Sequence, residues 1–132
     1  DGKLYAVGGQ SEADGAISDL VERYDLATIA WEAMAPMALA RKNSAVAVLE
    51  GKLCAVGGFN GDYLNSVERY DPAANAWEAV VPMGTARCNF AAAVLDGKLY
   101  AAGGYNGVHY LNSVERFNAA TNAWEAVAPM AV

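Results

Sequence analysis

Few side chains in this 132-residue chain could carry catalytic or metal chemistry. The sequence holds one histidine, His109, and two cysteines, Cys54 and Cys88. A metal site needs several such ligands converging on one point, and this set is too small to build one. Cys54 occupies the position that Tyr5 and Tyr100 hold in two equivalent segments, which indicates a buried apolar residue. A nucleophilic pair of Cys88 and His109 stays open as an alternative, although the two are distant in sequence.

Motifs for cofactor chemistry are also missing from the sequence. There is no phosphate-binding P-loop, no dinucleotide fingerprint and no serine-nucleophile motif. Gly-Gly pairs are present, but they precede loops, whereas a phosphate cradle opens a helix. We therefore expect no cofactor, no metal and no enzymatic activity. Carboxylates on converging loops leave open a catalytic pair, which the sequence alone does not test.

Aromatic and basic side chains are the better candidates, because these types dominate binding energy at protein interfaces. They fall in two kinds of segment. The segments that follow a Gly-Gly pair carry Gln10, Phe59, Tyr63, Tyr105, His109 and Tyr110. The segments that follow a Pro-Met pair carry Arg41, Lys42, Asn43, Arg87, Cys88 and Asn89. We predict that these residues bind a peptide or protein partner.

A threefold internal repeat arranges these segments. A stretch that ends in Gly-Gly recurs at residues 1–9, 50–58 and 96–104. Each copy continues with a Val-Glu-Arg segment, a tryptophan (Trp31, Trp77, Trp124) and a Pro-Met pair, at a period of 46 to 49 residues. The predicted units are residues 1–36, which lack a first strand, then 37–82 and 83–132.

One complete unit reads as four short strands with no helical period. The predicted strands are residues 43–49, 52–56, 65–71 and 76–80, with a tight hairpin turn at Glu50-Gly51. In the third predicted strand the apolar residues do not alternate cleanly, because Val67 and Tyr70 fall on opposite faces. Such a pattern fits a sheet that packs on both faces, or a bulge. Small four-stranded antiparallel sheets at this period bury their faces by radial stacking, so the fold class is all-β, with the sheets as blades of a β-propeller.

The repeat resembles kelch repeats, and Leu64 to Pro72 (Leu-Asn-Ser-Val-Glu-Arg-Tyr-Asp-Pro) is especially similar to the kelch-like branch. The resemblance implies half of a six-bladed ring. It also implies a substrate-recognition role in cullin-type ubiquitin ligases, where a separate BTB domain contacts the ligase. This sequence has no BTB segment, so ligase recruitment cannot come from it alone. Some kelch proteins modify sugars, so a carbohydrate-active propeller is a further alternative.

Three blades expose two apolar sheet faces, each larger than the few hundred Å² that a monomer usually shows. We expect either that two chains pair into a six-bladed homodimer or that the sequence is part of a longer chain. A self-assembling half-propeller without a ligand, natural or engineered, is therefore the alternative to a binding module. The source of the missing first strand stays open.

Variable loops indicate which face binds. From the second glycine of each pair to the valine of the Val-Glu-Arg segment, the steps are 12, 9 and 10, whereas the spacing before each tryptophan is constant. Variation on a constant scaffold favours a working surface. We call it the loop face: the loops between second and third strands, and the connections from fourth strands to the next unit. The resemblance implies ligand contacts at Phe59, Tyr105, Tyr63, Tyr110, Lys42 and Cys88.

Repetition also permits a structural role for several of these residues. Arg41 and Arg87 recur at one site and could bond loop carbonyls, or could bind an acidic peptide by bidentate pairing. The recurring arginines 23, 69 and 116 are predicted to form structural ion pairs with glutamates. Tyr63 and Tyr110 could instead simply cover the rim. Acidic residues also lie on the loop face: Glu12, Asp14, Asp19 and Asp62.

The net charge of −6 argues against nucleic acid, whose binding draws on clustered basic residues. Apolar runs are too short for a membrane span. Two cysteines are too few for a disulfide framework, so we expect a reducing, cytoplasmic setting.

Overall fold

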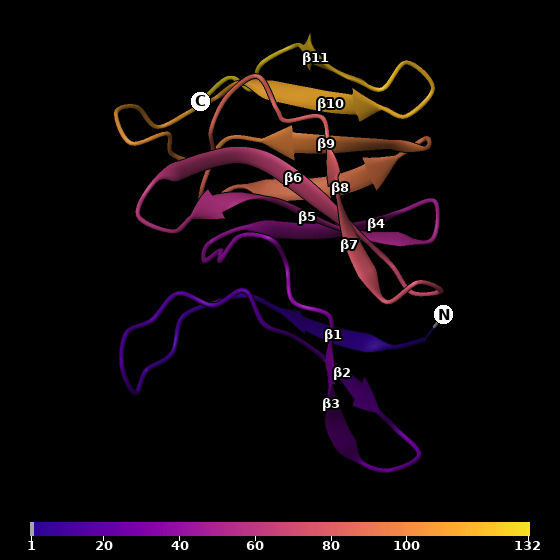
Figure 1. Cartoon of the computed structure of the whole chain (residues 1–132). Coiled ribbons are helices and arrows are strands. Elements are labelled where there is room, and N and C mark those ends of the chain that lie inside the picture. The colour runs from indigo at the N-terminus through magenta and orange to yellow at the C-terminus, as the bar shows by residue number, and fades with distance from the viewer. Residues whose placement is uncertain (1) are drawn as a thin grey trace.

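The computed structural model describes residues 2–132 as three antiparallel sheets stacked in chain order (Figure 1). The first sheet contains β1 (Leu4–Val7), β2 (Val21–Asp25) and β3 (Ala30–Met34). The second contains β4 (Ala45–Leu49), β5 (Lys52–Phe59), β6 (Tyr63–Asp71) and β7 (Ala76–Val80). The third contains β8 (Ala91–Leu95), β9 (Lys98–Ala102), β10 (Val114–Asn118) and β11 (Ala123–Val127). The all-β prediction is confirmed, and over residues 2–132 no helix is suited to crossing a membrane.

The strands follow the predicted order with shifted ends: β4 begins at Ala45 instead of residue 43, β6 begins at Tyr63 instead of residue 65, and β5 is extended. Sequence order equals spatial order in each sheet, as in a meander. The β4–β5 turn places Glu50 at a φ of 52° and Gly51 at 75°, the backbone of a type I′ hairpin. Strand β5 does not stop at the Gly-Gly pair but continues through it to Phe59, with a register shift between Val56 and Gly58. The bulge therefore lies beside the glycines.

The irregular pattern of β6 has its cause in packing on both faces. Val67 belongs to a cluster shared with the third sheet. Tyr70 points to the other side, where its ring lies 6.0 Å from that of Tyr5 and its hydroxyl contacts Met34 Sδ at 3.5 Å. Both residues are buried, so this sheet faces a neighbour on each side. Packing on both faces explains why β6 carries buried residues on each face over Val67 to Tyr70.

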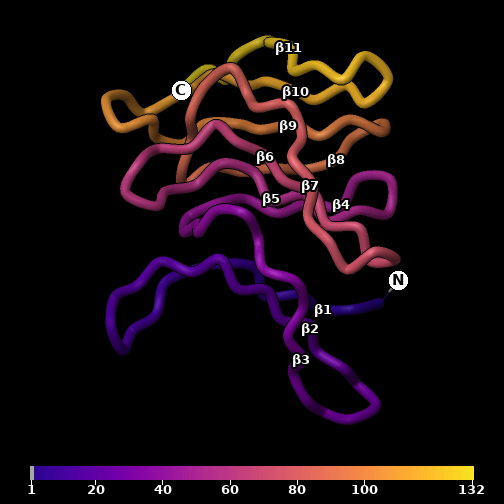
Figure 2. Tube along the Cα trace, viewed as in Figure 1, coloured from indigo at the N-terminus to yellow at the C-terminus, as the bar shows by residue number. Residues whose placement is uncertain are grey.

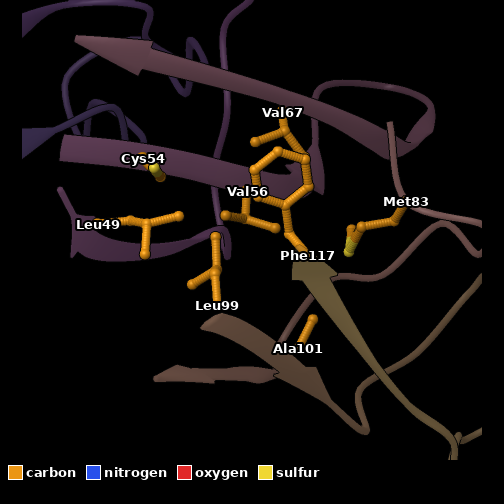
Figure 3. Close-up of a cluster of buried hydrophobic side chains, with 8 residues drawn as sticks. All are labelled: Leu49, Cys54, Val56, Val67, Met83, Leu99, Ala101 and Phe117. Atoms are coloured by element: carbon orange, nitrogen blue, oxygen red, sulfur yellow. The ribbon is translucent and has the colours of Figure 1, made fainter. Parts of the chain in front are cut away.

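The main hydrophobic core lies between the second and third sheets, as Figure 3 shows. The second sheet and the segment after it contribute Leu49, Cys54, Val56, Val67 and Met83, and the third contributes Leu99, Ala101 and Phe117. A smaller cluster of Val21, Met37 and Ala55 joins the first and second sheets. Burial of these side chains is what holds each sheet to the next.

Trp77 in the second sheet and Trp124 in the third each bind the main chain that follows the preceding sheet. The Trp77 indole donates to the Ala35 carbonyl at 2.8 Å, and the Trp124 indole donates to the Val81 carbonyl at the same distance. Both acceptors directly precede the proline of a Pro-Met pair. The recurring Trp and Pro-Met are therefore two halves of one contact between sheets.

The predicted surface ion pairs are present. Arg23 binds Glu32 at 2.6 Å, and Arg116 binds Glu125 at 2.6 Å. Arg69 binds Glu78 at 2.5 Å in the same cross-strand position. All three pairs are partly exposed, so each contributes little to stability.

One residue breaks the repeat at a strained position. Ile29 lies in the β2–β3 turn with a φ of 55°, where the equivalent turns have Asn75 and Asn122 at 47° and 51°. Asparagine tolerates this left-handed region, whereas a β-branched residue does so at a cost. The Ile29 side chain is 77% exposed, so its replacement loses little packing.

We predict that Ile29→Asn raises the free energy of unfolding by about 1 kcal/mol, measured by urea denaturation. Asn122→Ile is the matched reverse change and should lower it by a similar amount. No gain from Ile29→Asn, together with no loss from Asn122→Ile, would show that the left-handed backbone carries no strain.

Candidate functional site

The loop face is one side of the molecule. The β1–β2, β5–β6 and β9–β10 loops lie together on that side, at the left in Figure 2, and the β2–β3, β6–β7 and β10–β11 turns lie opposite. The candidate residues after the Gly-Gly pairs therefore share this side with those after the Pro-Met pairs.

Backbone bridges join the two kinds of segment. Lys42 and Phe59 exchange two N–H···O hydrogen bonds, at 3.0 and 2.9 Å. Cys88 and Tyr105 exchange an equivalent pair at 3.0 and 2.9 Å in the next repeat. Each bridge holds the residue after a Gly-Gly pair beside the residue after a buried arginine. The candidate positions are thus fixed by main-chain bonds and not by side-chain packing alone.

Four aromatic rings form a continuous row across two repeats. Phe59 and Tyr63 have ring centroids 4.9 Å apart, Tyr63 and Tyr105 are 5.6 Å apart, and Tyr105 and Tyr110 are 4.8 Å apart. We call these four residues the aromatic strip. Tyr63 is the link, because it lies in β6 of the second sheet and its ring meets the Tyr105 ring of the third repeat in a T-shaped contact. Tyr110 is 89% exposed and ends the strip.

Lys42 extends the strip toward the first repeat. Its ammonium lies 5.6 Å from the centroid of the Phe59 ring, within reach of a cation–π interaction. The same ammonium donates to Gln10 Oε1 at 3.1 Å. Gln10 is itself held by a hydrogen bond from its side-chain amide to the Gly15 carbonyl, at 2.8 Å. Candidate residues from all three repeats are therefore in one connected surface.

Arg41 and Arg87 are not part of that surface, which corrects their place among the binding candidates. Their exposed fractions are 0% and 1%. Arg41 donates to the Gly57 and Ser66 carbonyls at 2.8 and 3.0 Å and pairs with Glu68 at 3.0 Å. All three of these partners of its side chain belong to the second repeat. Arg41 therefore fixes the connection between β3 and β4 to strands β5 and β6 of the second sheet.

The remaining candidates lie on the loop face with different exposure. Asn43, Asn89 and His109 are exposed, and the Asn89 N–H donates to the Asn43 carbonyl at 2.9 Å. Cys88 is buried, so its side chain is not available to a partner, whereas the next residue, Asn89, is exposed. Burial raises the pKa of the Cys88 thiol, although the nearby Lys42 charge opposes the shift.

The two thiols are poorly suited to nucleophilic chemistry. Burial raises the pKa of Cys54 to about 11, so this thiol stays protonated at neutral pH. Cys88 is shifted in the same direction. Among residues 2–132, no three His, Cys, Asp or Glu side chains gather in a way that could hold a metal ion.

Sequence reasoning missed a hollow at the end of the strip. It has a volume of about 340 Å³ and is lined by Asn89, Gly104, Tyr105, Tyr110 and Leu111. Leu111 repeats Leu64 in the Leu-Asn-Ser motif, so its sequence position signals a structural residue and gives no hint of the hollow.

Gly107 was also missed. A β-carbon there would lie 2.7 Å from the Tyr63 ring, so only glycine lets that ring lie against the third repeat. The signal was the Asn-Gly pair that both the β5–β6 and β9–β10 loops contain.

Known families and solved structures agree with this arrangement of three antiparallel sheets. The family model described as the Kelch motif matches residues 1–38, 40–84 and 86–131. Kelch-like protein 5 from Homo sapiens is 46% identical over 57 residues, which cover 42% of this chain and 8% of that protein. The solved chain titled "Structure of YjhT" superposes with a TM-score of 0.81 at 18% identity, over 98% of this chain and 49% of that one. The chain thus spans about half of that solved structure, whose likeness concerns the fold. The three sheets are kelch propeller blades, and the chain belongs to the kelch-repeat family.

Proposed function

We propose that this chain is a protein-interaction module that binds a peptide or protein partner on its loop face. The observation that carries the proposal is the aromatic strip, an unbroken row of rings from Phe59 to Tyr110. Aromatic side chains provide large contact areas at a low cost in conformational entropy. Main-chain bridges hold the strip in place before a partner arrives, which lowers the cost of ordering it on binding.

The type of partner follows from which basic residues are accessible. Arg41 and Arg87 are buried and already paired with glutamates. Their guanidinium groups are therefore not available to bind a carboxylate of a partner. Lys42 is partly exposed beside Phe59 and already contacts Gln10. We therefore favour a peptide read through apolar and aromatic contacts over one read through clustered acidic residues. A carbohydrate-active role has no comparable observation in its favour.

Tyr110→Ala is the sharpest test of this site. The side chain is 89% exposed, so its removal should change the unfolding free energy by less than about 0.5 kcal/mol. If Tyr110 anchors a partner, the variant should bind a peptide selected from a display library about 10- to 100-fold more weakly. Affinity is measured by titration calorimetry on the variant and the parent chain.

Thr121→Ala provides the control, because Thr121 lies in the β10–β11 turn on the opposite side. It should leave the affinity unchanged. A library that yields no binder, or a binder equally sensitive to Thr121→Ala, would contradict the proposal.

The adaptor role is a finer part of the same proposal. The kelch-like resemblance of residues 64–72 supports recruitment of a substrate protein to a cullin-type ubiquitin ligase. In that role, this chain supplies substrate binding and a BTB domain elsewhere supplies the ligase contact. Purification of the partner from cells, followed by a ubiquitylation assay with the chain fused to a BTB domain and with that BTB domain alone, tests it. A partner that is bound but never ubiquitylated would restrict the chain to binding.

Self-assembly is a second candidate function, favoured by exposed positions at both ends of the stack. Leu4 is 60% exposed, whereas the equivalent Leu99 is 1% exposed between sheets. Met130 is 40% exposed, whereas the equivalent Met83 is 2% exposed. A second copy packed head to tail would cover both residues through the same contacts that join the sheets within one chain.

Light scattering on a size-exclusion column tests this candidate. A homodimer that completes six blades should have twice the 13.8 kDa mass of the chain. Leu4→Glu should return it to a monomer, because the charge would be buried without a partner. A concentration-independent monomer of the parent chain would exclude the homodimer.

A further inference from the structure

A tyrosine-to-cysteine difference between repeats leaves a specific space in the core. Strand register makes Cys54 the equivalent of Tyr100, because each is the cross-strand partner of a repeated arginine, Arg69 or Arg116. In the third sheet, Arg116 Nη1 donates to the Tyr100 hydroxyl at 3.2 Å. In the second sheet, the thiol of Cys54 is far shorter and cannot replace that ring and hydroxyl.

Tyr5 shows how a tyrosine packs at this position of the repeat. It is the third member of the set, paired with Arg23 in the first sheet. Its ring packs on Tyr70 of the next sheet, with centroids 6.0 Å apart. The equivalent of Tyr70 in the third sheet is Phe117, which shares a cluster with Cys54 instead of a tyrosine. Figure 3 shows Cys54 on the second sheet and Phe117 on the third, in the cluster that the two sheets share. Phe117 therefore lacks the ring that Tyr70 has on that side.

A cavity of about 160 Å³ lies beside Cys54, between the second and third sheets. Its apolar walls come from both sheets: Leu49, Cys54, Val67 and Val80 from the second, and Leu99, Phe117 and Trp124 from the third. An apolar cavity of about 150 Å³ in a protein interior holds one benzene molecule. The volume therefore suits a single six-membered aromatic ring.

The polar end of the cavity carries a hydrogen-bond donor. Lys52, Glu50 and Arg69 line it, and all three are at least partly exposed. Arg69 Nε is bonded to Glu78, as Arg116 Nε is bonded to Glu125. Arg116 has a tyrosine hydroxyl as an additional acceptor, and the described part of the chain gives Arg69 no such acceptor.

We propose that this cavity binds a small phenol, with the ring between Cys54 and Phe117 and the hydroxyl oxygen accepting a hydrogen bond from Arg69. The site lies beside the β4–β5 turn, on the side away from the loop face, so it is separate from the proposed partner site. The protonated, buried thiol of Cys54 forms a neutral wall that a ring can contact. Para-substituted phenols of the size of a tyrosine side chain are the chemical class expected.

Phenol and benzene are the probes, titrated into the isotopically labelled chain to about 10 mM and followed by methyl NMR. Saturable shifts are expected at the Leu49, Val67 and Leu99 methyl groups that line the cavity. Phenol should bind about fivefold more tightly than benzene, because it adds one hydrogen bond, and the Arg69 donor is partly exposed to competing water. Arg69→Met should remove this preference while retaining benzene binding.

Cys54→Tyr is expected to fill the cavity and abolish binding of both probes. If that variant does not fold, the location of the shifts in the parent chain decides the question by itself. The proposal is overturned if the parent chain shows no saturable shifts, if the shifts lie away from the cavity, or if a folded Cys54→Tyr variant binds phenol as the parent does.

Discussion

Arg87→Ala is expected to lower the free energy of unfolding by about 3–5 kcal/mol, because it leaves a buried carboxylate without its counter-charge. Arg87 donates to the Gly103 and Ser113 carbonyls, each at 2.9 Å, and pairs with Glu115 at 3.2 Å. Glu115 also accepts from the Gly84 N–H at 2.7 Å, which ties the connection between sheets to β10. Removal of the arginine therefore unpairs a charge and the Gly103 carbonyl together, whereas the Ser113 carbonyl keeps a bond from the Gly103 N–H at 3.0 Å.

Arg116→Ala is the matched control, since Arg116 is also a repeated arginine that binds a glutamate. Its pair with Glu125 is partly exposed, so the loss should stay below about 1 kcal/mol. Urea unfolding followed by tryptophan fluorescence measures both variants. Equal losses would mean that the burial of the Arg87–Glu115 pair has no energetic consequence.

These two arginines also show how far the sequence could be interpreted. Both recur at fixed positions, so repetition marks each as part of the scaffold and does not distinguish a buried from an exposed ion pair. The exposed pairs could be predicted, because Arg116 and Glu125 face each other across adjacent strands. The buried pair depends on the path of a connection, and its partners are main-chain carbonyls that no side-chain pattern encodes.

The fold was more accessible to prediction than the site, and the reason is physical. Strand order, hairpin turns and the kelch repeat follow from local patterns that occur several times in one chain. The aromatic strip does not, because Tyr63 reaches into the next repeat to meet Tyr105. That contact depends on the conformation of the β9–β10 loop, where Gly107 makes room for the ring. The cavity at Cys54 has a visible sequence signal, but only packing shows that no neighbour fills the space.

Gly58→Ala should lower the unfolding free energy by about 3–5 kcal/mol and weaken partner binding as well. Gly58 has a φ of 102°, which an L-residue rarely adopts. A β-carbon there would also lie 2.8 Å from the Lys42 carbonyl oxygen and 2.9 Å from Ser44 Cβ. Phe59 follows directly, and its bridge to Lys42 is the first anchor of the aromatic strip. A shift large enough to relieve the clash must therefore move Phe59.

Gly61→Ala is the control that distinguishes the cost of the backbone conformation from the cost of the steric clash at Gly58. Gly61 has a similar φ of 112°, but a β-carbon there would meet no atom within 4 Å. Its replacement should cost only the strain, roughly 1–3 kcal/mol, and should leave the Lys42–Phe59 bridge intact. Urea unfolding and peptide titration on both variants give the comparison. If Gly58→Ala is no worse than Gly61→Ala in either measurement, the close backbone approach at the Gly-Gly pair does not hold the strip. If only Gly58→Ala loses affinity beyond its loss of stability, the glycines that allow the blade to form also position its binding surface.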